Sequence, residues 1–376
     1  MRPFARHISI SREMPSSTVV GGIATFYWHL LSTFDCPGQV WITSTFSDRV
    51  PSRHGAIVHT FTAEFVKRRI TRFARLLQIP RALWFRFAAG LLVAWYMRLG
   101  QVYVETPDYG ADGIAVALLK VLFPSRIFLH VRAHGPSGWN RHDGSIAMRN
   151  CGRGLSRLYY PLEQLLFRVA DVVTAPTHYM ASIVGSRMRS IPRVVLNPFS
   201  ATLVREVAAR SAEALAQEPD VRSSARIVFL GTWLRTKGAD EFRQLVQDAG
   251  LANSDALVLG SDPTHSCPFR REVLAYEQLL GFLALNKPVV FVGGIHESFG
   301  YALLDAAAAG ALVYARDTPA TRELVNAFQL RDVVLFRDVS AEELARILHS
   351  PPSSSAPGSF TGNEYVDAVC ARGRPS

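Results

Sequence analysis

The segment Val289–Glu323 reads VVFVGGIHESFGYALLDAAAAGALVYARDTPATRE, and its pattern indicates the class of fold. Its apolar run Val289–Val292 is typical of a buried strand, and a second such run, Ala311–Ala315, follows a segment rich in alanine. That segment, Tyr301–Ala309, is predicted as a helix that Gly310 closes. Two buried strands joined by a helix predict an α/β fold with a parallel sheet.

The glycine-rich turn between the first strand and the helix predicts an anion site. The first N–H groups of a helix have no partner within it, and the helix dipole favours negative charge there. Glu297 lies on this turn and Asp305 on the second turn of the helix. Acids in this setting bind sugar or ribose hydroxyls while backbone N–H groups hold phosphate. The alternative is a loop acid and a solvated helix acid without a ligand.

The segment HESFGYALLDAAAAG, residues 296–310, resembles the Glu-x7-Glu signature of retaining GT-B glycosyltransferases of the glycosyltransferase family 4 type. The usual form is E-(S/G)-F-G-L-x-x-L-E-A-M-A-x-G. The matching residues are Glu297, Phe299, Gly300, Leu304 and Gly310, and Asp305 replaces the second Glu. The resemblance implies two Rossmann-like domains facing a central cleft and transfer from a nucleotide-diphosphate sugar with retention.

Two loops in the first half resemble other parts of the same family. Gly21 and Gly22, which precede the expected helix Ala24–Thr33, resemble the N-terminal glycine loop over the donor phosphates, with a plain tight turn as the alternative. His134 follows the expected strand Arg126–Val131, the position where open α/β sheets bind ligands. It matches the family's active-site His-Gly, whereas a histidine inside the strand, His130, is expected in the core.

The loop GTWLRTKG, residues 231–238, resembles the family pattern G-R-x-x-x-x-K-G. Lys237 stands at the Lys position, but Thr232 replaces the Arg that helps to neutralise the donor diphosphate. Two alternatives remain: Arg235 substitutes for that Arg from a nearby position, or this role in binding the diphosphate is lost. The resemblance therefore implies that Lys237, with Arg235 and the N–H groups near Phe299 and Gly300, stabilises the leaving diphosphate.

The resemblance also implies roles for the acids and for the histidine. Glu297 would hold the hydroxyls of the donor sugar, Asp305 the ribose, and His134 the sugar or the reacting face. Front-face attack assisted by the leaving phosphate requires no dedicated protein base. No metal or other cofactor is expected, and the chain has no Asp-x-Asp.

The segment VVLNP, residues 194–198, resembles the hinge motif of the same family, and the resemblance implies a boundary between two domains there. We expect residues 1–198 to form an acceptor-side Rossmann-like domain and residues 199–350 a nucleotide-sugar-binding one. Residues 351–376 are expected to be a linker and a tail that crosses back to the first domain. Residues 261–296 look shorter than the family pattern by about one strand–helix unit, which leaves the nucleotide base open.

The distribution of charged residues limits the classes of binding partner that we expect for this chain. Residues 1–200 hold 24 Lys and Arg against 10 Asp and Glu, a balance of +14, and residues 201–376 hold 17 against 21, a balance of −4. The first half is therefore expected to face an anionic partner. No nucleic-acid-binding motif is present, which favours an anionic membrane surface or a phosphorylated acceptor. The four cysteines are scattered, and the longest apolar run of the first half, Phe87–Met97, is too short to span a bilayer, so a cytoplasmic location is expected.

One segment indicates where a membrane would bind. Glu64–Leu77 has apolar residues at helical spacing and carries Lys67, Arg68, Arg72 and Arg75 on other faces. It is either a solvated basic helix or one that binds a membrane surface or an acceptor. The next expected helix, Trp84–Met97, is predicted as core.

These features favour a retaining glycosyltransferase that acts on a glycan or a lipid-linked acceptor in polysaccharide or cell-envelope glycan biosynthesis. The alternatives are another GT-B activity, such as an epimerase or a phosphorylase, and a catalytically inactive carbohydrate-binding homologue.

Overall fold

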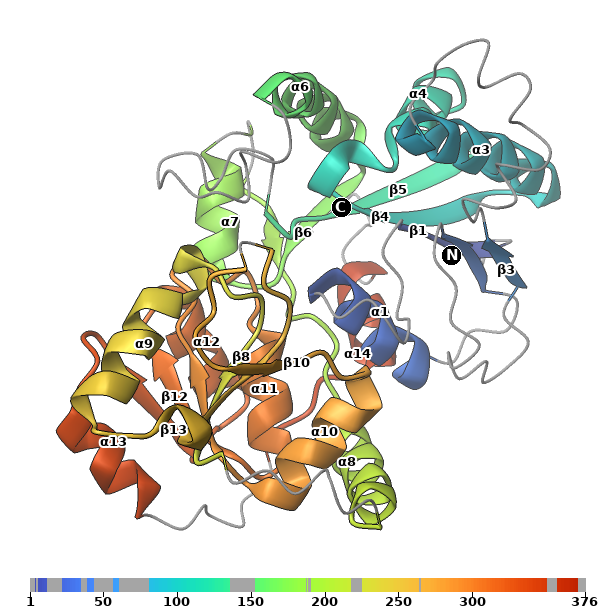
Figure 1. The fold of residues 1–376 in the computed structure, drawn as a ribbon. Helices are drawn as coiled ribbons and strands as arrows, with labels where there is room; N and C mark the ends of the chain where they lie inside the picture. Colours follow the sequence, from blue (N-terminus) through green and yellow to red (C-terminus); the bar gives the residue numbers. More distant parts are fainter. Residues whose placement is uncertain are drawn as a thin grey trace. The chain divides into compact units, whose positions relative to one another are not determined.

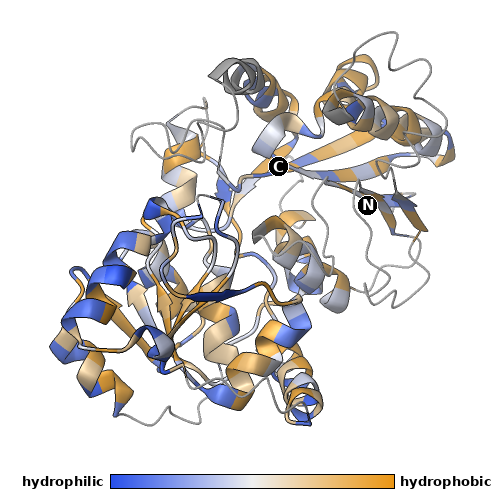
Figure 2. Ribbon diagram, viewed as in Figure 1, coloured by the Kyte–Doolittle hydropathy of each residue, from blue (hydrophilic) through white to orange (hydrophobic). Residues whose placement is uncertain are grey.

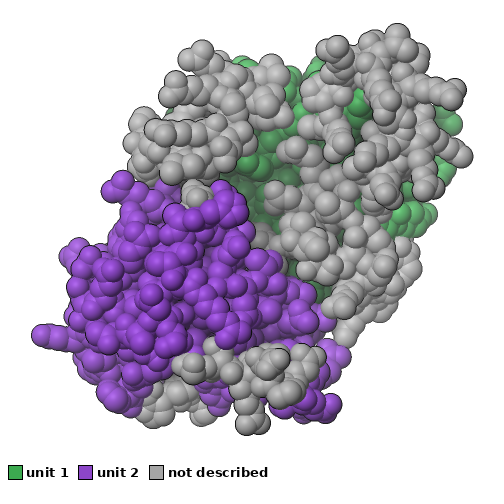
Figure 3. All heavy atoms as spheres, in the orientation of Figure 1, with its two compact units in different colours: residues 1–139, 151–199, 360–376 green, residues 140–150, 200–359 purple. Residues whose placement is uncertain are grey.

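The computed structural model describes residues 4, 6–11, 22–34, 39–43, 57–60, 81–135, 153–186, 188, 191–217, 225–263, 265–349 and 357–370. They form two compact units, each built on a parallel sheet (Figures 1 and 3). Unit 1 contains the described residues up to Phe199 and from Phe360 onward, and unit 2 contains those from Ser200 to Ser359.

Unit 1 has a seven-stranded sheet in the order β3-β2-β1-β4-β5-β6-β7, and every pairing is parallel. The strands are β1 (Arg6–Ser11), β2 (Val40–Thr43), β3 (Ile57–Thr60), β4 (Val102–Pro107), β5 (Ile127–Arg132), β6 (Val172–Ala175) and β7 (Arg193–Val194). The helices are α1 (Gly22–Thr33), α3 (Arg81–Tyr96), α4 (Ile114–Leu122), α6 (Arg153–Val169), α7 (His178–Gly185) and α14 (Gly362–Cys370), with the 3-10 helices η1 (Met97–Leu99) and η2 (Tyr109–Ala111).

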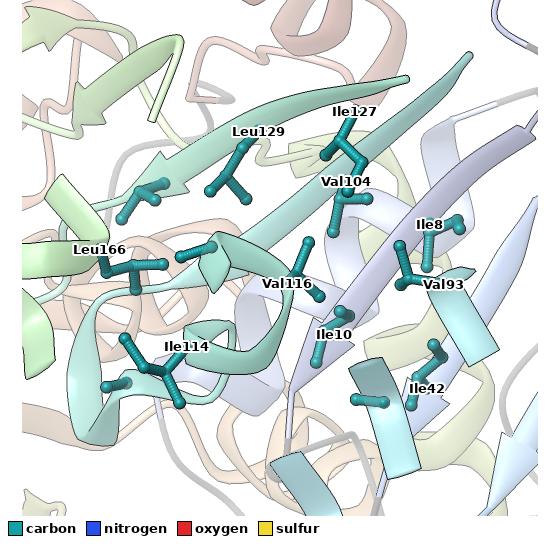
Figure 4. Close-up of a cluster of buried hydrophobic side chains, with 14 of the residues drawn as sticks. Ile8, Ile10, Ile42, Val93, Val104, Ile114, Val116, Ile127, Leu129 and Leu166 are labelled. Atoms are coloured by element: carbon teal, nitrogen blue, oxygen red, sulfur yellow. The ribbon is translucent and has the colours of Figure 1, made fainter. Parts of the chain in front are cut away.

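Aliphatic side chains of the central strands make the core of unit 1. Ile8, Val104 and Leu129, from three neighbouring strands, pack against Val93 of α3 and Val116 of α4 (Figure 4). Strands that are buried on both faces favour such runs of β-branched and aliphatic residues. The sheet order reverses between β1 and β4, and ligands bind at the carboxyl ends of the strands at such a point.

Unit 2 repeats this plan with a six-stranded parallel sheet in the order β10-β9-β8-β11-β12-β13. The strands are β8 (Ile227–Leu230), β9 (Ala256–Leu259), β10 (Arg270–Glu272), β11 (Val289–Val292), β12 (Leu312–Arg316) and β13 (Val333–Phe336). The helices are α8 (Ala201–Leu215), α9 (Ala239–Asp248), α10 (Tyr276–Asn286), α11 (Tyr301–Ala308), α12 (Pro319–Ala327) and α13 (Ala341–Leu348), with η5 (Arg235–Lys237) and η6 (Asn253–Asp255). The order reverses between β8 and β11.

One expectation about the elements was wrong. The segment that looked too short contains strand β10 and helix α10, and β10 escaped notice because Arg270, Arg271 and Glu272 carry no apolar pattern on an edge strand. Helix α8 begins directly after Ser200, whose side chain caps its first turn. Helix α6 begins eight residues before Pro161, which lies inside it rather than at its start.

Two further expectations concern residues whose placement the structure does not describe. Gly21 and the segment Glu64–Leu77 both lie outside the described residues. Gly22 is the first residue of α1. Among the described helices, none combines the length and the apolar character that crossing a membrane would require.

The C-terminal segment belongs to unit 1. Phe199 and Phe360 exchange two backbone hydrogen bonds, with N···O distances of 2.6 and 2.7 Å. Beyond this bridge, the buried ring of Tyr365 on α14 packs against Phe26 of α1 and His130 of β5, with ring centroids 5.5 and 6.1 Å apart. Aromatic packing thus fixes α14 beside the sheet.

Candidate functional site

Two loops of unit 2 meet at the carboxyl ends of neighbouring strands. The loop after β8 leads through η5 into α9, and the turn after β11 leads into α11. Because β8 and β11 are hydrogen-bonded neighbours, their loops emerge at the same edge of the sheet. The backbone N–H of Ile295 donates to the carbonyl oxygen of Thr236 over 3.1 Å, which joins the two loops.

Glycine makes this contact possible. Gly238 begins α9 with a φ of 87°, a left-handed conformation that side chains disfavour. A Cβ atom added to Gly238 would lie 2.7 Å from the Cα atom of Gly293, so the two backbones touch. Packing between the two loops therefore explains why glycine occupies positions 238 and 293.

Lys237 and Glu297 form an ion pair across this contact. The Lys237 Nζ atom donates to Oε1 of Glu297, and the two side chains are 39% and 19% exposed. A Cβ atom on Gly294 would lie 2.5 Å from that same oxygen, so glycine leaves room for the carboxylate. The structure thus brings together two of the residues singled out from the sequence, a cation and an acid, in a position that solvent reaches.

The other residues of the glycine-rich turn shape the start of α11. Gly300 has a φ of 68° and precedes the first helical residue. Phe299 is buried, and its ring packs against those of Tyr301 and Phe328, with centroids 4.8 and 6.1 Å away. Phe299 therefore anchors the turn by packing, and the first N–H groups of α11 follow Glu297 by only a few residues in the chain.

Asp305 lies deeper than an acid on a solvated helix face would. Its side chain is only 3% exposed, and its Oδ1 atom accepts a hydrogen bond of 2.8 Å from the hydroxyl of Tyr276 at the start of α10. Burial and the Asp305 charge raise the pKa of Tyr276 well above its ordinary value, so the hydroxyl stays protonated and donates. Helix α10, which the sequence did not reveal, thus supplies the partner of Asp305.

Two arginines of unit 2 lie near these loops and make different contacts. Arg235 is 87% exposed, and its Nε atom pairs with Asp240 at 3.2 Å on the first turn of α9. Arg316, at the end of β12, was missed: its Nε atom donates to the carbonyl oxygen of Gly293 over 3.0 Å, and its Nη2 atom to Glu241 over 2.6 Å. Its position at the carboxyl end of the strand beside β11 was the available signal.

Unit 1 carries a second polar cluster at the carboxyl ends of β4 and β5. The His134 N–H donates to Oδ1 of Asp108 over 2.8 Å, and the Gly135 N–H donates to Oδ2 over 3.4 Å. Burial raises the pKa of Asp108 from 3.8 to about 6, although these N–H groups favour the charged form. Sequence reasoning found His134 but missed Asp108, which directly follows β4.

A buried ion pair lies in the same region. The Arg132 Nε atom is 3.1 Å from Oε1 of Glu105, and the Arg132 guanidinium lies 3.1 Å from the ring centre of Phe26. Burial, reinforced by the Arg132 charge, holds the pKa of His134 well below its ordinary value, so its ring is neutral at neutral pH. Within the described part of the chain, the buried Nε2 atom of His134 has no hydrogen-bond partner.

The core assignment of the other histidine is confirmed. His130 is fully buried, and its two ring nitrogens lie 2.7 Å from the hydroxyl of Tyr103 and 2.8 Å from that of Thr174. Among the described residues, no three His, Cys, Asp or Glu side chains gather as a metal site would require. The expectation of a metal-free site stays a prediction.

The two sheets, each with a strand order that reverses at its centre, define a pair of Rossmann-like α/β domains. No protein-family model and no curated protein matches this sequence. Solved structures do match it at low identity. The catalytic domain of starch synthase IV from Arabidopsis thaliana, bound to ADP and acarbose, is 14% identical with a TM-score of 0.58 and covers 92% of this chain and 91% of its own.

Trehalose-phosphate synthases match over a similar span. The UDP-forming α,α-trehalose-phosphate synthase of Burkholderia xenovorans, in complex with glucose-6-phosphate, is 12% identical with a TM-score of 0.59 and covers 92% of each chain. A trehalose-6-phosphate structure from E. coli, bound with UDP-2-fluoro glucose, is 11% identical with a TM-score of 0.55 and covers 96% of this chain and 93% of its own. These neighbours are GT-B glycosyltransferases, so the expected GT-B class of fold is confirmed.

Proposed function

We propose that this chain is a retaining glycosyltransferase that takes a sugar from a nucleotide-diphosphate donor. One observation carries the proposal: the Lys237–Glu297 pair, held by touching glycine backbones at the point where the sheet of unit 2 reverses. A cation beside an opening helix suits a diphosphate, and a partly exposed carboxylate suits sugar hydroxyls. The GT-B fold and the nucleotide-sugar neighbours support the same reading.

The proposed chemistry follows from these groups. The bond between the anomeric carbon and the diphosphate oxygen breaks while the acceptor oxygen bonds to that carbon on the same face. The acceptor proton passes to the leaving phosphate oxygen, so no protein base is needed. Lys237 and the N–H groups after Gly300 stabilise the charge that develops on the diphosphate. Glu297 exchanges its contact with Lys237 for the hydroxyls of the donor sugar.

Other residues have supporting roles in the proposal. Arg316 fixes the carbonyl of Gly293 and thereby the glycine-rich turn. Tyr276 orients the carboxylate of Asp305, which is buried. Asp305 therefore contacts the ribose only if the nucleotide extends into that buried position. Arg235 pairs with Asp240 in the structure, so we assign the principal phosphate contact to Lys237 rather than to Arg235. The role that the family resemblance implies for His134, contact with the sugar or the reacting face, completes the proposal.

The acceptor that we propose is a glycan or a lipid-linked sugar. The starch synthase neighbour is bound to ADP and acarbose, and a trehalose-phosphate synthase neighbour is bound to glucose-6-phosphate. The excess of Lys and Arg in residues 1–200 supports an anionic acceptor or an anionic surface that carries it. Biosynthesis of a polysaccharide or cell-envelope glycan is the corresponding process.

A panel of nucleotide sugars tests the donor assignment. A ligand present at about 100 times its dissociation constant stabilises the folded protein by about 2.7 kcal/mol, which a thermal-shift assay detects. We expect at least one nucleotide sugar and its nucleoside diphosphate to stabilise the chain. Transfer of the sugar to a glycan or lipid separates a transferase from an epimerase or phosphorylase. If no nucleotide sugar binds, the proposal fails.

Two observations favour a second candidate, an inactive carbohydrate-binding protein. Thr232 replaces a phosphate-binding Arg, and its hydroxyl lies 3.2 Å from that of Ser261. Asp305 is buried against Tyr276. Binding of nucleotide sugars without release of nucleoside diphosphate would support this candidate, and release without any added acceptor would exclude it.

A further inference from the structure

Helix α3 is apolar on both of its faces. Its inner residues, Phe85, Ala89 and Val93, are buried in the core of unit 1. A helix on the surface of a soluble domain usually carries polar residues on its outer face. Here the outer positions, four residues apart, are occupied by Leu83, Phe87, Leu91 and Trp95, which are 41–57% exposed. From the sequence we expected this helix to lie in the core, but only its inner face is buried.

Helix α4 continues the same apolar face. A Cβ atom on Gly90 of α3 would lie 2.8 Å from the Cβ atom of Ala115, so the two helices pack closely side by side (Figure 1). Both helices are coloured as largely hydrophobic in Figure 2. Leu118, Val121 and Leu122 of α4 are 54–70% exposed. Together with the four outer residues of α3 they form a surface that we call the α3–α4 face.

The charges around the α3–α4 face are positive. Residues 81–107 and 113–130 contain a single acid, Glu105, which is buried and paired with Arg132. Two cations are exposed there: Arg98 lies within η1, and Arg126 directly precedes β5. Lys120 is buried and pairs with Asp171 at 2.7 Å. An apolar face with exposed cations and no exposed acid in these segments matches the interface of an anionic bilayer.

We propose that the α3–α4 face docks unit 1 on an anionic lipid bilayer, with its apolar side chains among the acyl chains and its arginines among the headgroups. Helix α3, with 16 residues, is about 24 Å long at 1.5 Å per residue, so it lies along the interface rather than across the bilayer. A two-fold contact between copies of the chain would place this cation-bearing face against itself, which disfavours a second copy as its occupant. The inference goes beyond the transfer reaction and does not depend on it.

Vesicle flotation of the full chain tests the proposal. The vesicles contain phosphatidylcholine alone or mixed with phosphatidylglycerol, and neither donor nor acceptor is added. We expect the wild-type protein to float with the anionic vesicles. The combined substitution Phe87→Gln, Leu91→Gln and Trp95→Gln should reduce the bound fraction at least about tenfold, because it removes the inserted apolar groups. Arg98→Gln with Arg126→Gln should weaken binding to anionic vesicles only.

A matched control uses apolar side chains that are exposed elsewhere. Ile191 and Val273 are 81% and 62% exposed and lie outside α3 and α4. Ile191→Gln with Val273→Gln should bind vesicles as the wild type does. Because the assay contains no nucleotide sugar, a failure of the glycosyltransferase proposal leaves its result unchanged, and the reverse also holds.

A second measurement avoids the risk that the triple variant fails to fold. Brominated lipids should quench the fluorescence of the wild-type protein more than that of Trp95→Phe, because Trp95 lies on the α3–α4 face. Equal quenching, or flotation of a folded triple variant at the wild-type level, would overturn the proposal. So would a wild-type protein that ignores vesicles and forms dimers that the triple substitution dissociates, since the face would then bind a second copy.

Discussion

The two units place different chemistry on the same order of strands. In unit 2, a lysine and a glutamate pair on partly exposed loops, and glycines bring the loops together. In unit 1, a buried carboxyl holds the backbone of a loop that carries a neutral histidine. The first arrangement suits a charged ligand that displaces an ion pair, and the second suits neutral hydroxyls. The sheet therefore fixes where each site lies, and the loops decide what it binds.

The glutamate of unit 2 should matter most to the reaction. Glu297→Gln keeps the size of the side chain but removes its charge and an acceptor for sugar hydroxyls. We expect the fold to remain intact and the rate of transfer to fall by about a hundredfold, which corresponds to about 3 kcal/mol. Steady-state kinetics with the preferred donor measure this, and circular dichroism checks the fold. Unchanged turnover would refute the role assigned to Glu297.

The lysine should affect phosphate binding rather than sugar recognition. Lys237→Ala should weaken binding of a free nucleoside diphosphate by about 1.5–3 kcal/mol, because a charge-assisted contact is lost. Arg235→Ala is the matched control, since Arg235 is exposed and pairs with Asp240. Isothermal titration calorimetry distinguishes the two. A larger loss for Arg235→Ala than for Lys237→Ala would reverse the assignment.

The contact between the loops of unit 2 can be tested through its glycines. Gly238 and Gly310 have similar φ angles of 87° and 84°, but only at Gly238 would a Cβ atom meet backbone, whereas at Gly310 nothing lies within 4 Å. Gly310→Ala therefore measures backbone strain alone. Gly238→Ala should destabilise by about 1–3 kcal/mol more, because it also forces the loops apart. Urea denaturation followed by fluorescence compares them, and equal midpoints would contradict the packing account.

Substitution of Asp108, the buried carboxyl of unit 1, should give the smallest effect. It should change how the stability of the fold depends on pH. The pKa of Asp108 is raised by burial from 3.8 to about 6, so the folded protein binds this proton more tightly than the unfolded chain. The stability that Asp108 contributes is thus present at low pH and is lost as the pH rises through about 6. Asp108→Asn should remove this dependence while keeping an oxygen that accepts from His134.

Urea midpoints between pH 4 and 7 and the pH profile of kcat/KM give the readouts. In the wild type we expect an acid limb near the Asp108 pKa of about 6, where protonation weakens the acceptor of the His134 and Gly135 N–H groups. The limb should be shallow, a few-fold in rate, since the carboxyl acts through the loop. An identical profile in Asp108→Asn would show that another group titrates.

Elements that depend on a local sequence pattern could be predicted from the sequence. Elements and contacts that depend on which strands pair with each other were missed. The strand, turn and helix around Glu297 could be recognised because their residues are contiguous and their apolar runs are clear. Strand β10 could not, because its three residues are charged and its identity comes only from pairing with β9. Tyr276 was missed with the helix that follows this strand, and its contact with Asp305 spans 29 residues.

The same limit explains the missed residues at the strand ends. Asp108 acquires its role because β4 pairs with β5 and thereby brings the His134 backbone to its carboxyl. Arg316 reaches Gly293 because β12 pairs with β11. The outer face of α3 was taken as core because periodicity alone does not separate a helix that is buried on both faces from one that is half exposed.

Donor turnover followed by proton NMR tests directly whether unit 2 binds a nucleotide-diphosphate sugar and whether the chain transfers that sugar with retention. The purified chain is incubated with each nucleotide sugar, with and without a glycan or lipid-linked acceptor. We expect one donor to release its nucleoside diphosphate and the sugar product to appear first with the anomeric configuration of the donor. A first product of inverted configuration, or no release from any donor, would contradict it.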